Sequence, residues 1–143
     1  VKMSKEVQWS VLRTNSSFVV KKNGSVFSKE RGNLRNKNSP RYNGLINAKA
    51  VDVTFGPNGG AVVSVKSSRN SNRPATQFSR QAVPAKGGNY RRVAHVVSNA
   101  TAGTYYRGDL EKAALARWTK IDRAQRTTSS GISKQRSRAL VKQ

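Results

Sequence analysis

Basic side chains outnumber acidic ones so strongly that they limit both how this chain can fold and what it can bind. The 143 residues include 28 Lys and Arg but only six Asp and Glu, which gives a formal net charge of +22 at pH 7. A small domain usually carries a net charge of about 2–8, and a larger surplus of one sign repels itself in the compact state. The chain therefore needs a polyanionic partner, for which RNA, DNA and an anionic membrane are the candidates.

The apolar content allows one small hydrophobic core. Hydrophobic residues make up 35% of the chain, against roughly 45–50% in globular proteins when Gly is counted as well. This length suits one domain, or one domain with tails. We assign residues 1–126 to a single domain that binds the polyanion, which the residues considered below indicate to be RNA. Residues 127–143 contain four basic residues and no acidic one, and we expect this basic tail to be disordered without RNA.

The first predicted strand is 7–13, where Val, Trp and Val occupy every second position. Alternation with a period of two is typical of a strand with one buried face. The next apolar run, 18–20, fits either a strand or a short helix, and the Asn-Gly pair that follows it at 23–24 favours a hairpin turn.

A second hairpin is predicted at 51–67, where two alternating apolar segments flank a Gly-rich turn. Residues 75–83 are expected to be extended as well. Between the two hairpins lies 28–49, a basic segment rich in Gly, Asn and Ser. A loop of this length inside a small domain is usually functional. We expect that it can hardly fold alone and is ordered only when it is bound to RNA.

Two helices are predicted near the C-terminus. Four apolar residues in 90–100 have the i, i+3, i+4, i+7 spacing of an amphipathic helix, although their β-branched side chains keep a strand as the alternative. In 109–126 the apolar residues fall on one side, and acidic residues come first and basic residues last, as the helix dipole favours. Strands followed by helices predict an α+β fold, with helices packed on one face of a small antiparallel sheet.

The core is expected to contain the apolar residues that these patterns turn inward. They are Trp9, Val11, Phe18, Val20, Phe27, Val53, Phe55, Val63, Val65, Val93, Val97, Leu110, Trp118 and Ile121.

Catalysis and metal binding have little support in the sequence. The absence of Cys excludes disulfides and thiolate metal sites, and the single His, His95, has no carboxylate near it in the sequence. The Gly-rich turn at 56–60 lacks the ending of a phosphate-binding loop. We therefore expect no enzyme activity, no metal, no cofactor and no small-molecule substrate.

Folded RNA is the favoured polyanion. No run approaches the roughly 18 apolar residues of a membrane helix, and the charge is not confined to one amphipathic helix, so we expect no membrane partner. The sequence has no helix-turn-helix, zinc-finger or basic-zipper pattern, and no RRM or KH motif. Charge that is spread over loops, helix faces and tail suits a protein surrounded by folded RNA, whereas a reader of duplex DNA concentrates it on one face.

Arg and aromatic side chains are the candidate RNA contacts. The planar fork of Arg matches phosphate oxygens, and aromatic rings can stack on unpaired bases. For Tyr42 and Tyr105 both local packing and stacking remain open. Gly44 is expected to adopt a positive φ or to allow a close approach of RNA. The candidates are Arg31, Arg35, Lys37, Arg41, Tyr42 and Asn43 in the long loop, Arg69 and Arg73 after the second hairpin, and Arg91, Arg92, Arg107, Arg123, Arg126, Arg136 and Arg138 in the helical part and tail.

Six stretches of the chain carry a family resemblance. They are QWSVLR at 8–13, NSSF at 15–18, NL at 33–34, NSPRYNGLI at 38–46, RPAT at 73–76 and YRGDL at 106–110. Together they resemble the ribosomal protein L-twenty-eight family of the eukaryotic large subunit, which is distinct from the bacterial protein of that number. The likeness runs from about Val7 to Arg126, and Gly108 stands where relatives often have Pro.

The resemblance implies a structural protein of the large ribosomal subunit with an α+β fold, no cofactor and no catalysis. Its implied partners are large-subunit ribosomal RNA and neighbouring ribosomal proteins. Its implied location is the cytosolic ribosome, with assembly in the nucleolus. The alternative is a basic nuclear nucleic-acid-binding or ribosome-assembly protein. A related domain occurs in such an assembly factor, but that family contains Cys and this chain has none.

Overall fold

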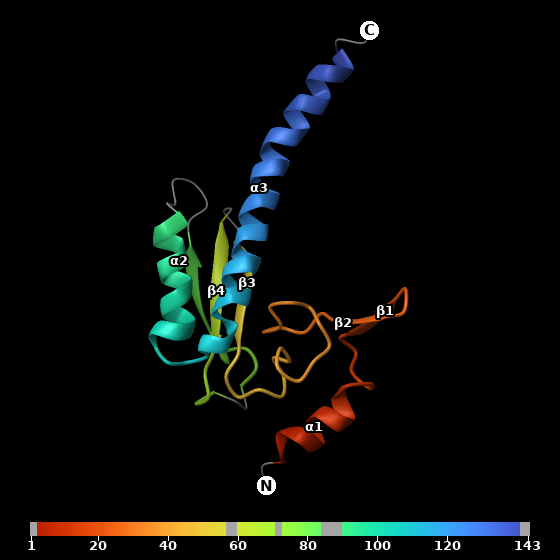
Figure 1. Cartoon of the computed structure of the whole chain (residues 1–143), viewed down its shortest axis with the longest axis vertical. Helices are drawn as coiled ribbons and strands as arrows, with labels where there is room; N and C mark the ends of the chain where they lie inside the picture. The colour runs from red at the N-terminus through yellow and green to blue at the C-terminus, as the bar shows by residue number, and fades with distance from the viewer. Residues whose placement is uncertain (1–2, 57–59, 71–72, 84–89, 141–143) are drawn as a thin grey trace.

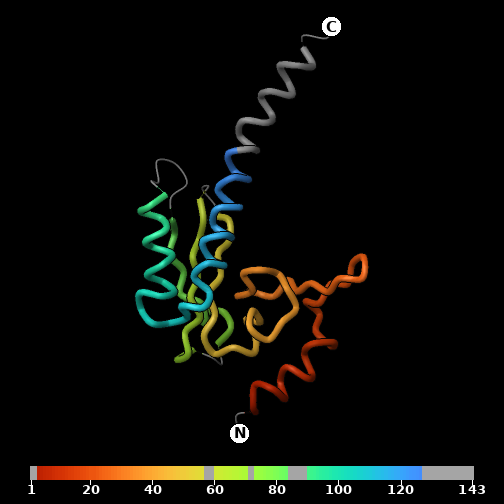
Figure 2. Tube along the Cα trace, viewed as in Figure 1, coloured from red at the N-terminus to blue at the C-terminus, as the bar shows by residue number. Residues whose placement is uncertain are grey.

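The computed structural model describes the backbone of residues 3–56, 60–70, 73–83 and 90–140, and the side chains in these ranges up to residue 126. Within these ranges it contains two antiparallel sheets and three α-helices (Figures 1 and 2). This arrangement confirms the predicted α+β fold. The elements in chain order are α1 (Lys5–Leu12), β1 (Val19–Lys22), β2 (Ser25–Ser28), β3 (Val51–Phe55), β4 (Ala61–Lys66), β5 (Phe78–Val83), α2 (Tyr90–Ser98), a π-helical turn (Asn99–Gly103), a 3-10 turn (Gly108–Leu110) and α3 (Glu111–Leu140).

The central sheet has the order β3-β4-β5, and all its pairs are antiparallel. Val53 lies opposite Val63, and Val63 lies opposite Gln81. The predicted hairpin at 51–67 is therefore confirmed. The segment 75–83, predicted to be extended, is a strand only over Phe78–Val83, because residues 75–77 form a turn and a bend. Because side chains alternate along a strand, Val51, Val53 and Val63 share one face, where each is at most 1% exposed.

Helices α2 and α3 cover this face of the sheet and lie side by side (Figure 1). Val93 and Val97 are the buried residues of α2, and Leu110, Trp118 and Ile121 are buried at the start and along the inner side of α3. Full burial of an aliphatic side chain stabilises the fold by about 1.5–3 kcal/mol. The amphipathic patterns of both helices are thus confirmed, and the strand alternative for 90–100 is wrong.

The backbone of α3 continues to Leu140, beyond the end predicted near Arg126. The pattern ended where the apolar face ended, whereas the helical backbone continues through a segment that no Pro interrupts, since none occurs between 111 and 140. The side chains of 127–143 lie outside the described ones. That this tail is disordered without RNA stays a prediction.

The predicted strand at 7–13 is wrong, because this segment forms α1. Ser4 caps the helix by accepting a hydrogen bond from the Val7 amide at 3.4 Å. Val7 and Val11 are four residues apart, so they share a helix face as readily as a strand face. None of the α1 residues is buried, and Val11 is 57% exposed. Trp9 and Val11 are therefore not core residues.

The hairpin β1–β2 is confirmed, with Asn23 at φ 48° and Gly24 at φ 72° in its turn. Because Val19–Lys22 forms strand β1, the alternative of a short helix for the apolar run at 18–20 is wrong. The hairpin projects from the body of the protein (Figure 1), and a two-stranded ribbon has no second layer to bury its side chains. Phe18 and Phe27, which were predicted to be core residues, are 42% and 45% exposed.

Some of the remaining residues that were predicted to be in the core are buried, and others are not. Phe55 ends β3 and is 60% exposed, while Val20 and Val65 are only partly buried. The confirmed core residues are Val53, Val63, Val93, Val97, Leu110, Trp118 and Ile121. The structure adds Leu34, Ile46, Ala50, Val51, Ala61, Val83 and Ala114.

The long loop, 28–49, is held by buried polar side chains of its own. The Asn33 amide donates to Glu30 Oε1 at 3.1 Å, and the Asn43 amide donates to Glu30 Oε2 at 2.8 Å. All three residues are at most 4% exposed. Burial raises the pKa of Glu30, and the two amide donors oppose that shift because they favour the ionised carboxylate. That this loop could hardly fold alone stays a prediction, and the sequence patterns gave no indication of this polar network.

Lys66 of β4 joins the loop to the sheet. Its buried ammonium donates to the Gly44 carbonyl at 2.7 Å and to the Asn47 carbonyl at 2.9 Å. Burial lowers the pKa of Lys66. Gly44 does approach a backbone closely, but it is the backbone of its own chain: a Cβ there would lie 2.0 Å from the Arg31 carbonyl oxygen. Its φ is not positive, in contrast to that of Gly32.

Gly44→Ala is expected to destabilise the protein by about 1–3 kcal/mol or more, because the added methyl group overlaps backbone that cannot move freely. The free energy of unfolding in urea measures the effect. Gly108→Ala is the matched control, since a Cβ at Gly108 meets nothing closer than 3.8 Å. Equal stability of the two variants would contradict the close contact at Gly44.

Candidate nucleic-acid interface

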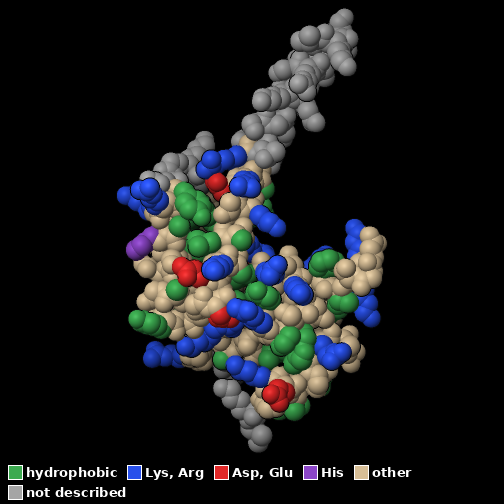
Figure 3. All heavy atoms as spheres, in the orientation of Figure 1, with side chains coloured by type: hydrophobic (Ala, Val, Ile, Leu, Met, Phe, Trp, Pro, Cys, Tyr) green, Lys and Arg blue, Asp and Glu red, His purple; other side chains and the backbone are tan. Residues whose placement is uncertain are grey.

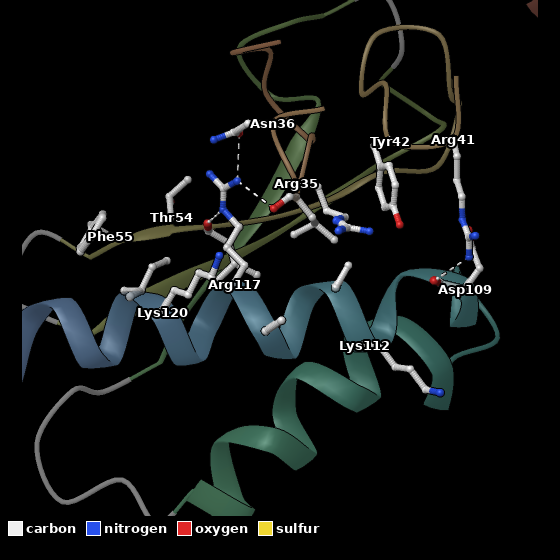
Figure 4. A pocket seen from close by; sticks show the side chains of 15 residues that line it. Arg35, Asn36, Arg41, Tyr42, Thr54, Phe55, Asp109, Lys112, Arg117 and Lys120 are labelled. Carbon is white, nitrogen blue, oxygen red and sulfur yellow. Dashed lines mark hydrogen bonds and ion pairs between the residues drawn. The ribbon is translucent and has the colours of Figure 1, made fainter. Parts of the chain in front are cut away.

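A groove of about 790 Å³ lies between α3, β3 and the loop around residues 34–42 (Figure 4). Arg35 and Lys120 point into the space between the loop and the helix (Figure 4). Asp109 is the one acidic residue among the described residues that line the groove. Its basic lining residues are Arg35, Arg41, Lys112, Arg117 and Lys120. The groove therefore presents a net positive wall that suits an anion.

Arg117 forms the floor of the groove and ties three elements together. Its guanidinium donates to the Val53 carbonyl at 2.7 Å, to the Asn33 and Leu34 carbonyls at 3.0 Å each, and to Asn36 Oδ1 at 3.1 Å. These bonds connect α3 to β3 and to the loop. Most of the five donors of an Arg side chain are used in this way, so Arg117 shapes the groove rather than offering a free cation.

Asp109 closes one end of the groove by pairing with two Arg residues. Arg107 donates to both of its oxygens, at 2.7 and 2.8 Å, and Arg41 Nε donates at 3.3 Å. The hydrogen bond from Arg107 is the main reason that the pKa of Asp109 is lowered, and the same contact raises the pKa of Arg107. Arg107 also donates to the Lys49 carbonyl at 3.0 Å, and its side chain is only 18% exposed. Arg107, a predicted RNA contact, is therefore engaged inside the fold.

Tyr42 is half-buried and packs against the core. The guanidinium groups of Arg35 and Arg41 lie 5.7 and 5.8 Å from the centre of its ring. Local packing accounts for this ring, while both Arg residues remain exposed at the groove. Of the residues predicted in the long loop, the structure thus brings Arg35, Arg41 and Tyr42 together.

The other predicted loop residues lie outside the groove lining. Arg31 places its guanidinium 4.1 Å from the centre of the Phe78 ring, and Lys37 is exposed. Asn43 is 4% exposed, and its Oδ1 accepts from the amides of Leu45 and Ile46 at 3.0 and 2.9 Å. The Asn43 side chain is therefore part of the loop's support and is not accessible to RNA in this structure.

The remaining predicted residues are spread over the surface. Arg69 and Arg73 are exposed between β4 and β5, and Arg91 and Arg92 are exposed at the start of α2. On α3, Arg123 and Arg126 are exposed, and Arg126 pairs with Asp122 at 3.0 Å. The side chains of Arg136 and Arg138 lie outside the described ones. Figure 3 shows the same dispersion: Lys and Arg side chains occur across the face in view, with few acidic ones between them.

Lys112 and Lys120 were not predicted as site residues. Both lie opposite the apolar side of the helix predicted at 109–126, and a polar side is usually only solvated. Ala116 lies midway between them, and all three line the groove. Their spacing of four residues puts them on one helix face. Two Lys residues on either side of a small residue are the signal that could have indicated a binding face.

Two absences hold for the residues that the structure describes. No helix among them is both long and apolar enough to cross a membrane. The same residues contain no group of three His, Cys, Asp or Glu side chains that could hold a metal ion.

The fold and the groove define a small, strongly basic α+β domain whose surface suits a polyanion. The chain belongs to the ribosomal L28e protein family, whose sequence profile matches residues 7–124. This confirms the family resemblance, and membership in a family of ribosomal proteins agrees with the prediction that the chain is not an enzyme.

Three proteins of known name are similar to this chain, two of them over nearly their full length. The chain is 34% identical to the large ribosomal subunit protein eL28 of Dictyostelium discoideum over 132 residues, which cover 92% of this chain and 96% of that protein. It is 31% identical to the protein of the same name from Schizosaccharomyces pombe over 128 residues, with 87% and 94% covered. The Caenorhabditis elegans protein of that name is 43% identical over 75 residues, with 51% and 57% covered.

Asp109→Asn is expected to lower the free energy of unfolding at pH 7 by about 1 kcal/mol, since solvent screens this partly exposed ion pair. The pKa of the carboxyl is lowered in the folded state, so its contribution is complete above its ordinary value of 3.8. The contribution is lost as the pH falls through the folded-state pKa. Urea unfolding between pH 7 and pH 2 should therefore show a deficit that shrinks in acid. Glu6→Gln, on exposed α1, is the control, and a deficit that is constant with pH would contradict the ion pair.

Proposed function

We propose that this protein is a structural constituent of the large subunit of the cytosolic ribosome, where it binds and stabilises folded ribosomal RNA. The observation that carries the proposal is the basic groove between α3 and the loop, in a chain of net charge +22. Support also comes from the two relatives that the chain matches over nearly their full length, since both are named large ribosomal subunit proteins.

The groove suits the phosphate backbone of RNA. Lys112 and Lys120 form no ion pair with any residue that the structure describes, so their ammonium groups are available to phosphates. Arg41 donates to the Asp109 carboxylate at 3.3 Å and to the Asp109 backbone carbonyl at 3.1 Å. Both contacts are exposed, and an exposed ion pair is worth only about 0–1 kcal/mol. A phosphate can therefore take the place of the Asp109 carboxylate on Arg41. Phe55 is 60% exposed at the groove and offers a ring on which a base can stack.

The exposed Arg residues outside the groove extend the interface. Arg69 and Arg73, Arg91 and Arg92, and Arg123 lie on different elements, so RNA on several sides of the protein is needed to meet them. Each phosphate that a basic side chain neutralises releases counterions, which is the favourable term in such binding. The tail, with Arg136 and Arg138, adds further contacts in this proposal.

The same proposal implies where in the cell the protein is found. The protein works in the cytosolic ribosome beside neighbouring ribosomal proteins, after assembly in the nucleolus. A basic nuclear nucleic-acid-binding or assembly protein is the alternative. The names of the relatives, at 87–92% coverage of this chain, favour the ribosome.

Removing two groove cations tests the interface. Arg35→Ala combined with Lys120→Ala should make the slope of log K against log salt shallower by about 2 for binding to purified large-subunit RNA, because each phosphate contact contributes about 1. Lys21→Ala combined with Lys22→Ala removes the same charge from β1 and is the matched control. Equal slopes for the two double variants would contradict a dedicated role of the groove.

Sedimentation of cell lysate through sucrose tests the ribosomal location. The protein should remain with large subunits after a high-salt wash, because many phosphate contacts break together only when the whole interface dissociates. The Arg35, Lys120 double variant should leave the particles at a lower salt concentration. Release of the wild-type protein as free protein, or its recovery with chromatin, would contradict the proposal in favour of the nuclear alternative.

A further inference from the structure

Tyr105 combines an unfavourable backbone conformation with a fully presented side chain, and no contact of its ring with the residues that the structure describes explains either. Its side chain is 94% exposed, and its φ of 50° lies in the left-handed region. That region is unfavourable for residues with a bulky side chain. The other described non-Gly residues with positive φ are Asn23 and Asn36, and Asn tolerates this conformation because its short side chain can bond locally. The chain thus places a large ring where Asn would suit the turn better.

The turn that carries Tyr105 is firmly held on both sides. Thr101 is fully buried, and its carbonyl accepts from the amides of Tyr106 at 3.1 Å and Arg107 at 2.9 Å. The Tyr106 hydroxyl donates to the Lys66 carbonyl and accepts from the Ala50 amide at 3.1 Å. The Tyr105 amide also donates to the Ala102 carbonyl at 2.9 Å. Because the backbone is held at and after Tyr105, the direction of its Cα–Cβ bond is set before any partner arrives.

The other three Tyr residues each have a contact inside the protein. Tyr42 packs on the core, Tyr106 makes the hydrogen bonds above, and the Tyr90 ring lies 5.2 Å from the ring of Trp118. Tyr105 is the most exposed of the four, at 94% against 55% for Tyr90, and its ring has no such contact among the described residues. Sequence alone left packing and stacking open for this residue, and its exposure excludes packing within the described fold.

We propose that Tyr105 is a stacking residue for an unpaired base of RNA, outside the groove. This inference rests on the proposed RNA-binding function. The net charge of +22 favours a nucleotide over a protein partner, and the acidic residue nearest to Tyr105 in the sequence, Asp109, is bound by two Arg residues. An unpaired base is required because the faces of paired bases are already covered by their neighbours in the duplex.

The test measures affinity with the full chain and two labelled probes. One is a single-stranded RNA oligonucleotide of mixed sequence, and the other is an RNA duplex of the same length. Tyr105→Leu and Tyr105→Asn should weaken single-stranded binding by roughly 5- to 150-fold, the range found when one stacking ring is removed. Tyr105→Phe keeps the ring and should keep the affinity. Duplex affinity should be the same for all variants, and Met3→Ala, which shortens another exposed side chain, is the control.

A second measurement separates stacking from a folding defect. Tyr105→Asn should raise the midpoint of thermal unfolding, because it relieves the strained backbone, while it weakens single-stranded binding. Loss of affinity together with a lowered midpoint would overturn the inference.

The outcomes also separate this inference from the function on which it rests. Intact wild-type binding with unchanged affinity of Tyr105→Leu overturns the stacking role alone. If that variant also incorporates poorly into large subunits, the ring meets a protein instead. Failure of the wild-type protein to bind either probe or large-subunit RNA overturns both proposals.

Discussion

The guanidinium of Arg117 is the interaction on which the arrangement of the groove depends. Its bonds to the carbonyls of Val53, Asn33 and Leu34 join the helical layer, the sheet and the long loop at one point. Carbonyl oxygens in a loop without regular structure need donors when they are buried, and one Arg supplies several at once. The depth of the groove, and the placement of Arg35 opposite Lys120, both follow from this connection.

The basic residues of the protein have two different roles: some bind other parts of the protein, and others face the solvent. Arg107 and Arg117 make most of their bonds within the protein, whereas Arg35 and the Lys residues of α3 face the solvent. The buried carboxylate of Glu30 also makes its contacts within the protein. It accepts hydrogen bonds from amide donors and not from cations. Composition alone cannot show this division, because it depends on which elements meet in space.

Local patterns in the sequence predicted the elements that carry a periodic apolar face. The hairpin of β3 and β4, helix α2 and the inner side of α3 are such elements, and they are confirmed. The pattern failed at α1, where Val7 and Val11 fit a strand and a helix equally and the Ser4 cap decided the outcome. It also gave no sign of the polar contacts that hold the long loop, because contacts such as Asn43 with Glu30 have no period. The groove could not be predicted, since Arg35 and Lys120 are far apart in the chain and only the tertiary fold brings them together.

The carbonyl oxygens that bind the Lys66 ammonium reduce the number of positive charges that the protein can offer to RNA. This ammonium is directed at the Gly44 and Asn47 oxygens and away from the solvent, and Arg107 and Arg117 are similarly committed. The 28 Lys and Arg residues are therefore more than the cations that can meet a phosphate at the same time. A measurement that counts displaced counterions should return a number below 28, and the cations that the protein uses to hold itself together account for part of the difference.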